Sequence, residues 1–160
     1  MIQVTRIVAA AAAAVVAAFA TVAAAQNWQA NPTYGSVRLA AGFTPDPYTV
    51  NLMSGGSINV RQTLGGSCVG YVANAPDFDL YWSAGSLPLV ISVHSQVDTT
   101  LVIRAPDGRW YCEDDGGFEG FNPGIRFDNA QSGLYDIYVG TYSGPTNHQA
   151  VLSISELSSY

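Results

Sequence analysis

Short runs of alternating apolar and polar residues recur along the chain, and this pattern restricts its fold more than any other feature. In residues 78–82, for example, Phe78, Leu80 and Trp82 share one face. Side chains alternate between the two faces of a strand, so this period predicts many short strands. Beyond residue 25 no segment keeps a helical period, and 16 Gly and 8 Pro interrupt the chain. We expect an all-β fold, an antiparallel, jelly-roll-like β-sandwich of about eight to ten short strands.

A β-hairpin is predicted within residues 98–117. Two strand-like runs, 99–104 and 109–112, flank the turn signal Ala105-Pro106-Asp107-Gly108. Proline presets φ and Asp-Gly favours the turn conformation. Three consecutive acids, Glu113-Asp114-Asp115, and two glycines follow the second run. The hairpin is therefore expected to end in an acidic loop.

The first 25 residues have the pattern of a secretory signal peptide. Arg6 precedes an Ala- and Val-rich run, and Ala23-Ala24-Ala25 stands before Gln26. A basic start, an apolar middle and a small-residue exit favour cleavage over the alternative, a transmembrane anchor. We predict a signal peptide over residues 1–25, a flexible arm over 26–33 and one sandwich domain over 34–160. The protein is expected to be exported to the periplasm or the medium and to leave the membrane after cleavage.

The charge balance excludes two classes of partner. Without residues 1–25 the chain has five arginines, no lysine and twelve acidic residues, a net charge of −7. Nucleic-acid phosphates and anionic membrane surfaces attract basic proteins. Neither is expected to bind here.

The chain has two cysteines, Cys68 and Cys112. An even count in an exported protein predicts a disulfide. A metal site would need more Cys or His ligands, and a nucleophilic thiol would have to be free.

Two stretches resemble a known family. One is Asp98-Thr99-x-Leu101-x-Ile103 with the turn and acids that follow it, and the other is Ser132-Gly133-Leu134-Tyr135-Asp136-Ile137-Tyr138-Val139-Gly140. Together they resemble the bacterial pre-peptidase C-terminal domain, a β-sandwich module found beside secreted peptidases. The resemblance covers residues 48–156 and implies an accessory or binding module, although this chain carries no peptidase domain.

We predict no catalytic residues. A serine hydrolase needs a base, and the only histidines are His94, expected on the outer face of a strand, and His148, expected in a turn. Ser67 lies in Gly-Gly-Ser-Cys-Val-Gly, which is not a nucleophile elbow. A small or degenerate secreted serine peptidase remains the alternative function, and with twelve acids a glycosidase carboxylate pair also stays open.

Asp107, Asp114 and Asp115 are the candidate metal ligands. Calcium takes six to eight oxygen ligands, and a bound cation would relieve repulsion between clustered carboxylates. Calcium is thus the one candidate cofactor. The alternative is a solvated acidic loop in which the carboxylates pair with Arg109 or Arg126.

Trp110, Phe118 and Phe121 are the candidate binding residues. Aromatic side chains beside acids can form a platform for a protein or polysaccharide ligand. The alternative is that they close the open end of the sandwich. The sequence therefore predicts an exported accessory or binding module without catalytic activity. A structural partner that helps another secreted protein to mature is a further alternative.

Overall fold

The alternating runs form the strands of two packed β-sheets in the computed structural model, which describes residues 25–118 and 120–158. The seven-stranded sheet contains β1 (Ser36–Ala40), β3 (Ile58–Asn59), β4 (Tyr71–Val72), β5 (Phe78–Ser83), β7 (Thr99–Arg104), β8 (Trp110–Glu113) and β10 (Gly133–Thr141). The four-stranded sheet contains β2 (Tyr48–Gly55), β6 (Leu89–Ser95), β9 (Gly124–Phe127) and β11 (Asn147–Ser155). The one helix among the described residues is α1 (Val60–Thr63). The prediction of an all-β sandwich is confirmed.

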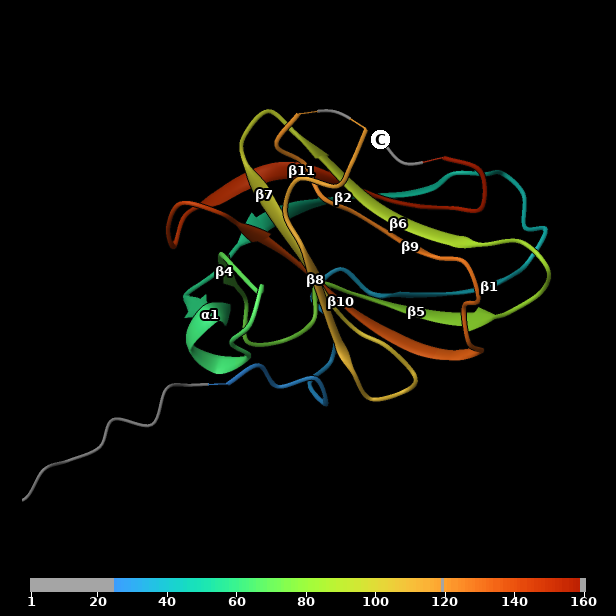
Figure 1. Ribbon diagram of the computed structural model, residues 1–160, viewed down its shortest axis with the longest axis horizontal. Coiled ribbons are helices and arrows are strands. Elements are labelled where there is room, and N and C mark those ends of the chain that lie inside the picture. Colours follow the sequence, from blue (N-terminus) through green and yellow to red (C-terminus); the bar gives the residue numbers. More distant parts are fainter. Residues whose placement is uncertain (1–24, 119, 159–160) are drawn as a thin grey trace, which may run out of the picture.

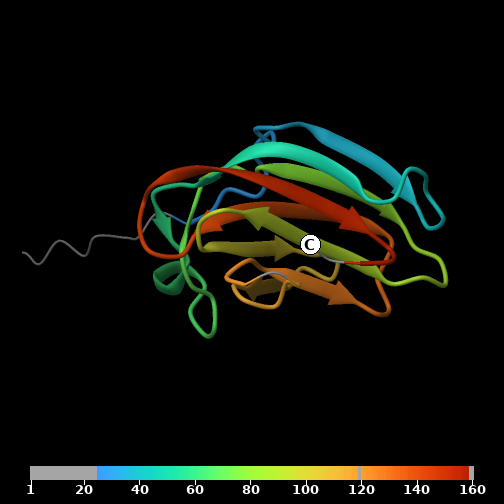
Figure 2. The ribbon, with the colours of Figure 1, turned by 90° about the horizontal axis from the view of Figure 1, so that it is seen from above.

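The two sheets form layers (Figure 1), with the four-stranded sheet above the seven-stranded sheet. Strands β2, β11, β6 and β9 lie side by side in that order in the view from above (Figure 2). In the lower sheet β10 is central and pairs with β5, β7 and β4. The predicted hairpin is confirmed, because β7 and β8 pair antiparallel with Arg104 opposite Trp110.

Two details differ from the predicted antiparallel sandwich. Strand β1 pairs with β5 in parallel, with Val37 opposite Leu80. Between β1 and β5 the chain passes through β2 of the other sheet, and so long a connection allows β5 to run parallel to β1. The described residues also form eleven strands rather than eight to ten, because β3 and β4 are separate pieces of two residues each.

The core lies between the sheets and follows the alternation in the sequence. From β5 and β10, Leu80 and Tyr135 stand opposite each other on the inner face and are buried. Leu152 and Ile91 are buried on the facing sheet. Trp82 and Tyr135, expected in the core, are 2% and 1% exposed. Each fully buried side chain of this kind stabilises the folded protein by about 1.5–3 kcal/mol.

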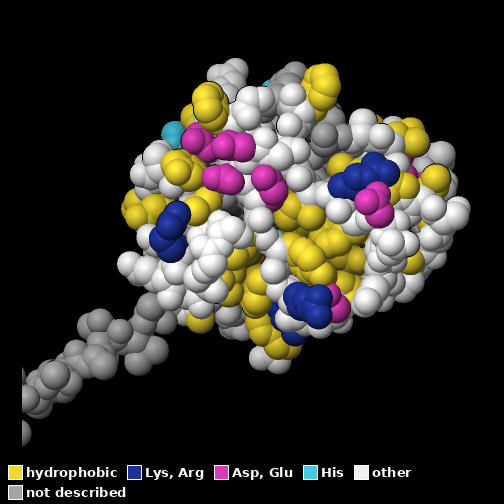
Figure 3. All heavy atoms as spheres, in the orientation of Figure 1, with side chains coloured by type: hydrophobic (Ala, Val, Ile, Leu, Met, Phe, Trp, Pro, Cys, Tyr) yellow, Lys and Arg dark blue, Asp and Glu magenta, His cyan; other side chains and the backbone are white. Residues whose placement is uncertain are grey.

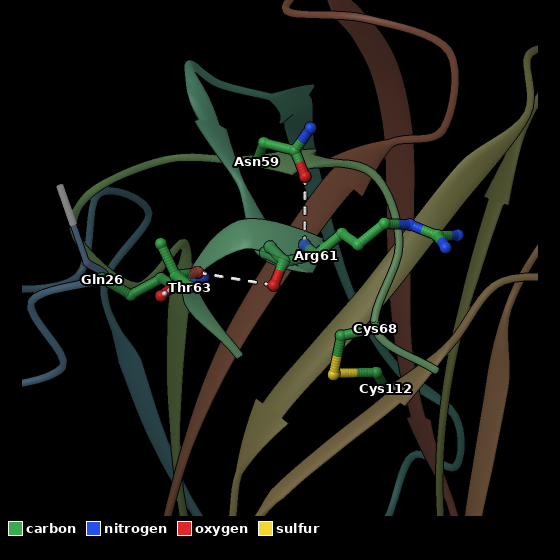
Figure 4. The surroundings of a disulfide bond; sticks show 7 residues. Gln26, Asn59, Arg61, Thr63, Cys68 and Cys112 are labelled. Atoms are coloured by element: carbon green, nitrogen blue, oxygen red, sulfur yellow. Dashed lines mark hydrogen bonds between the residues drawn. A yellow bond between two sulfur atoms is a disulfide. The ribbon is translucent and has the colours of Figure 1, made fainter. Parts of the chain in front are cut away.

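A second apolar cluster covers the outer face of the seven-stranded sheet. Its buried members, which we call the outer cluster, are Ile58, Val60, Cys68, Val72, Val102 and Tyr138. The predicted disulfide is confirmed between Cys68 and Cys112, and it fastens the segment after α1 to β8 (Figure 4). At the start of α1, the Asn59 side chain accepts a hydrogen bond from the backbone N–H of Arg61 at 3.0 Å. This cap accounts for a helix turn in a β protein.

Residues 26–33, predicted as a flexible arm, are held against the sandwich. The backbone N–H of Asn27 donates to Asn74 at 2.7 Å, and that of Thr33 donates to Pro76 at 2.9 Å. The Gln26 side chain accepts a hydrogen bond from Thr63 at 3.1 Å (Figure 4). Backbone bonds of this kind fix a segment that composition alone marks as loose.

The predicted signal peptide lies almost wholly outside the described residues, because the description begins at residue 25. No helix in the described part of the chain is long and apolar enough to cross a membrane.

Candidate functional site

The three predicted calcium ligands are not brought together. Asp107 lies in the turn between β7 and β8, whereas Asp114 and Asp115 follow the far end of β8. The four residues of β8 alone separate these ends by about 10 Å, because a strand rises about 3.4 Å per residue. Asp107 therefore cannot share an ion with the other two. No group of three or more His, Cys, Asp or Glu among the described residues is arranged to hold a metal ion.

Asp107 closes the hairpin turn instead. Its carboxylate accepts hydrogen bonds from the backbone N–H of Arg109 at 2.9 Å and from the Tyr111 hydroxyl at 2.8 Å. These two bonds lower the pKa of Asp107, because they stabilise the charged form. The residue is a turn former, as aspartate commonly is at such positions.

The acids at the other end of the hairpin form an acidic cluster of Asp98, Glu113, Asp114 and Asp115. Burial raises the pKa of Asp98, and the carboxylates of Asp115 and Asp114 raise it further. Burial likewise raises the pKa of Asp114, and the carboxylates of Asp115 and Glu113 raise it further. Acidic side chains gather on one part of the surface in Figure 3. The cluster therefore has an unbalanced negative charge.

The two arginines considered as partners for this cluster pair elsewhere. Arg126 bonds Asp128 at 2.7 Å, and Arg109 lies 3.9 Å from Asp107. The pairing of these arginines with the acidic loop is therefore not found, while the solvated loop itself stays an open alternative. Glu113 binds backbone instead, and its carboxylate accepts hydrogen bonds from the N–H groups of Gly116 and Gly124.

Two of the three predicted binding aromatics are exposed beside the acidic cluster. Phe118 is 81% exposed and Phe121 is 69% exposed. Phe118 lines a hollow of about 360 Å³ whose other lining residues include Arg126 and Leu157. Exposed apolar patches rimmed by polar residues commonly mark interaction sites on soluble proteins.

Trp110, the third predicted binding residue, belongs to a different part of the molecule. It is half-buried on the outer face of the seven-stranded sheet and packs on Tyr138 with ring centroids 5.8 Å apart. Its neighbour Cys112 holds the disulfide. Trp110 therefore packs against the outer cluster and is not part of the platform with the two phenylalanines.

Asn122 positions the loop that carries these phenylalanines, and it is absent from the predicted site. Its side chain is buried, donates to the carbonyl of Ser95 at 2.9 Å and accepts from the Thr99 hydroxyl at 2.8 Å. Its own carbonyl accepts from Gly117 at 2.9 Å. The only sequence signal was an asparagine before a proline, which favours turns in general.

The two histidines point to opposite faces of the four-stranded sheet. His94 stands opposite Val151 on β11, and His148 lies three residues before Val151 on that same strand. Because side chains alternate along a strand, an odd separation places them on opposite faces. His148, expected in a turn, is in β11, where its ring lies 3.2 Å from the Thr146 hydroxyl. Both histidines nevertheless contribute to the lining of one shallow groove on this sheet.

A row of charged side chains lies beneath residues 26–33. Asp79, Asp136 and Arg104 stand side by side on adjacent strands, and Arg104 contacts Asp136 at 3.5 Å. Trp28 stacks on the Arg104 guanidinium, 3.7 Å from ring centroid to Cζ. Burial, and then Asp136, raise the pKa of Asp79 to about 6. Both carboxyl groups are buried, so they do not face each other across an open cleft as glycosidase acids do.

The comparisons with known proteins identify no family. No protein-family model matches the chain, and no curated protein matches it. One solved structure that the chain weakly resembles is that of Aeromonas hydrophila PliG, a periplasmic inhibitor of g-type lysozyme. The two are 10% identical, with a TM-score of 0.39, over 79% of this chain and 98% of that one. This likeness is too weak to say anything about function.

Proposed function

We propose that the protein is an exported, non-catalytic binding module that holds a partner protein with a basic surface. The contact surface is the aromatic loop, residues 114–118 and 120–123, together with the acidic cluster. The exposure of Phe118 and Phe121 carries the proposal, because aromatics of this size dominate protein interfaces when they are buried there.

The loop is held in place before any partner arrives. Asn122 ties it to β6 and β7, and Glu113 ties its first glycine to β8. A fixed loop loses little conformational freedom on binding, so more of the contact energy is available for affinity.

Charge decides the kind of partner. Burial, and then the neighbouring carboxylates, raise the pKa of Asp98 and of Asp114, and the arginines at 109 and 126 are engaged with other carboxylates. Lysine or arginine on a partner would relieve that repulsion and would also stack on the phenylalanine rings. An acidic or neutral surface offers neither interaction.

Two observations support export and a role beside another secreted protein. The Cys68–Cys112 disulfide forms in oxidising compartments, which agrees with export. The resemblance to the pre-peptidase C-terminal domain supports a place beside another secreted protein. Stabilising or maturing that protein would use the same surface.

The test is capture of proteins from the medium and periplasm of the producing cells by the purified exported protein. The comparison uses wild type, Phe118→Ala with Phe121→Ala, and Asp114→Asn with Asp115→Asn. We expect a captured basic protein whose affinity falls about 100-fold with the phenylalanine pair, since two buried aromatics contribute several kcal/mol. The Asp variants should weaken binding and reduce its salt dependence.

Leu87→Ala is the matched control, because Leu87 is also an exposed apolar residue, at 43%, but lies between β5 and β6. Capture that is unchanged in both loop variants would refute the proposal, as would capture of only acidic proteins. Labelling of a serine by a fluorophosphonate, lost in His94→Ala or His148→Ala, would refute the non-catalytic part.

A further inference from the structure

A shallow groove of about 780 Å³ lies on the four-stranded sheet, away from the aromatic loop. Strands β2, β11 and β6 contribute to its lining, and these strands lie side by side in Figure 2. The volume falls within the range of about 300–1,000 Å³ that is typical of ligand sites.

Exposed amide side chains stand around this groove. Asn51 lies opposite Val151, and Met53 lies opposite Gln149, so these four side chains share the outer face of the sheet. Gln96 follows the end of β6 and also lines the groove. Asn51, Gln96 and Gln149 are all exposed to solvent.

The groove has no formally charged lining, in contrast to the rest of this acidic protein. None of the described residues that line it is Asp, Glu, Lys or Arg, although His94 and His148 also contribute to the lining. Each amide offers two donor hydrogens and one acceptor oxygen, which matches hydroxyl groups that both donate and accept. Met53, 39% exposed, and Val151 supply apolar surface between the amides for the C–H face of a sugar ring.

The side chain of Tyr34 occupies the free edge of β2 beside the groove. The Tyr34 hydroxyl accepts a hydrogen bond from the backbone N–H of Met53 at 3.0 Å. A peptide that added a strand to β2 at this point would have to displace it. Further bonds fix the groove floor, where the Ser95 hydroxyl donates to the Gln149 carbonyl at 2.8 Å. The site is preformed and disfavours strand addition.

From these features we propose that the groove binds an uncharged oligosaccharide through Asn51, Gln96 and Gln149. The site is separate from the protein-binding surface proposed above and does not depend on it. Hydroxyls of the sugar would pair with the amides, while the ring would lie on Met53 and Val151.

The experiment is affinity electrophoresis of the full exported protein in gels that contain amylose, laminarin, hydroxyethyl cellulose or glycol chitin. We expect at least one of these neutral polysaccharides to retard the wild-type protein. Asn51→Ala and Gln149→Ala should each weaken that binding about tenfold, because each removes hydrogen bonds of about 1–1.5 kcal/mol. The double variant should migrate as in a gel without polysaccharide.

Gln62→Ala is the control, since Gln62 is an exposed amide on α1 over the other sheet. Melting temperatures close to wild type would show that the variants fold. Phe118→Ala should leave retardation unchanged, which separates this site from the aromatic loop. Retardation by none of the four polymers would overturn the proposal. So would equal retardation of wild type and double variant.

Discussion

At the scale of single residues, the same side chain has opposite roles according to its surroundings. Asp107 is in an exposed turn, and hydrogen bonds to its carboxylate lower its pKa. Asp77 is buried, at 3% exposure, and burial raises its pKa to about 7 against the effect of one hydrogen bond from Val139. The first residue favours the folded state when it is charged, and the second when it is neutral.

Asp77 should make the protein less stable as the pH rises. Its folded pKa of about 7 exceeds the ordinary aspartate value of 3.8, so its contribution is fully present below about pH 4 and is lost as the pH rises through 7. At about 1.4 kcal/mol per pKa unit, that loss is up to about 4 kcal/mol. In Asp77→Asn the amide oxygen can still accept from Val139, and the free energy of unfolding should fall less steeply from pH 4 to 8.

Urea unfolding at several pH values measures this difference. Burial also raises the pKa of Asp79, to about 6, and this residue makes wild type and Asp77→Asn alike less stable as the pH rises. The effect of Asp77 is therefore the difference in pH dependence between the two proteins. Asp128→Asn is the control, because its side chain is 72% exposed. Equal slopes for wild type and Asp77→Asn would contradict the assignment.

At the scale of elements, the hairpin of β7 and β8 determines where the candidate residues lie. Its turn holds Asp107, and its other end leads into the acidic cluster and the aromatic loop. The alternation within β8 places Trp110 and Cys112 on the outer face, beneath the segment that follows α1. One short strand thus separates residues that are close together in the sequence.

Loss of the disulfide should loosen this outer layer more than the sandwich. Cys68 and Cys112 are 44 residues apart, and closing a loop of that length contributes up to about 4 kcal/mol in the chain-entropy model. For Cys68→Ala with Cys112→Ala we expect a lower melting temperature and faster amide exchange in residues 58–72. Exchange in the centre of β10 should change least, because both of its neighbours remain. A melting temperature equal to that of the oxidised protein would contradict this expectation.

At the scale of the whole molecule, the contact between the two sheets holds the fold together. The inner-face side chains of β5 and β10 meet those of β6 and β11 in one continuous core. Of the five strands that end the two sheets, β1, β3, β8 and β9 are short and only β2 is long, which limits unwanted pairing with other chains.

Leu80→Ala should therefore destabilise the protein by about 2–5 kcal/mol, as removal of a fully buried leucine commonly does. Leu157→Ala, at a residue that is 73% exposed, should change stability by less than about 0.5 kcal/mol. Denaturant unfolding of both variants makes the comparison. Equal effects would mean that the sheets are not packed as described.

Much of the fold could be predicted from neighbouring residues alone. The period-two runs predicted the strands, Asp-Gly predicted the hairpin turn, and the two cysteines predicted the disulfide. Phe118 and Phe121 are exposed as expected, whereas Trp110 is half-buried against the outer cluster, and a binding role stays a prediction for all three. The difference arises because residues that are close in sequence can lie on different parts of the surface.

The amino-acid sequence by itself determined the strand content, the turn and the acidic character of this protein. These properties follow from backbone stereochemistry and from side chains a few residues apart. Only the tertiary structure decided that Asp107 is remote from Asp114, that Asp79 adjoins Asp136, and that three strands share one amide-lined groove. Such neighbours depend on the pairing and register of segments far apart in the chain, and neither segment alone carries that information.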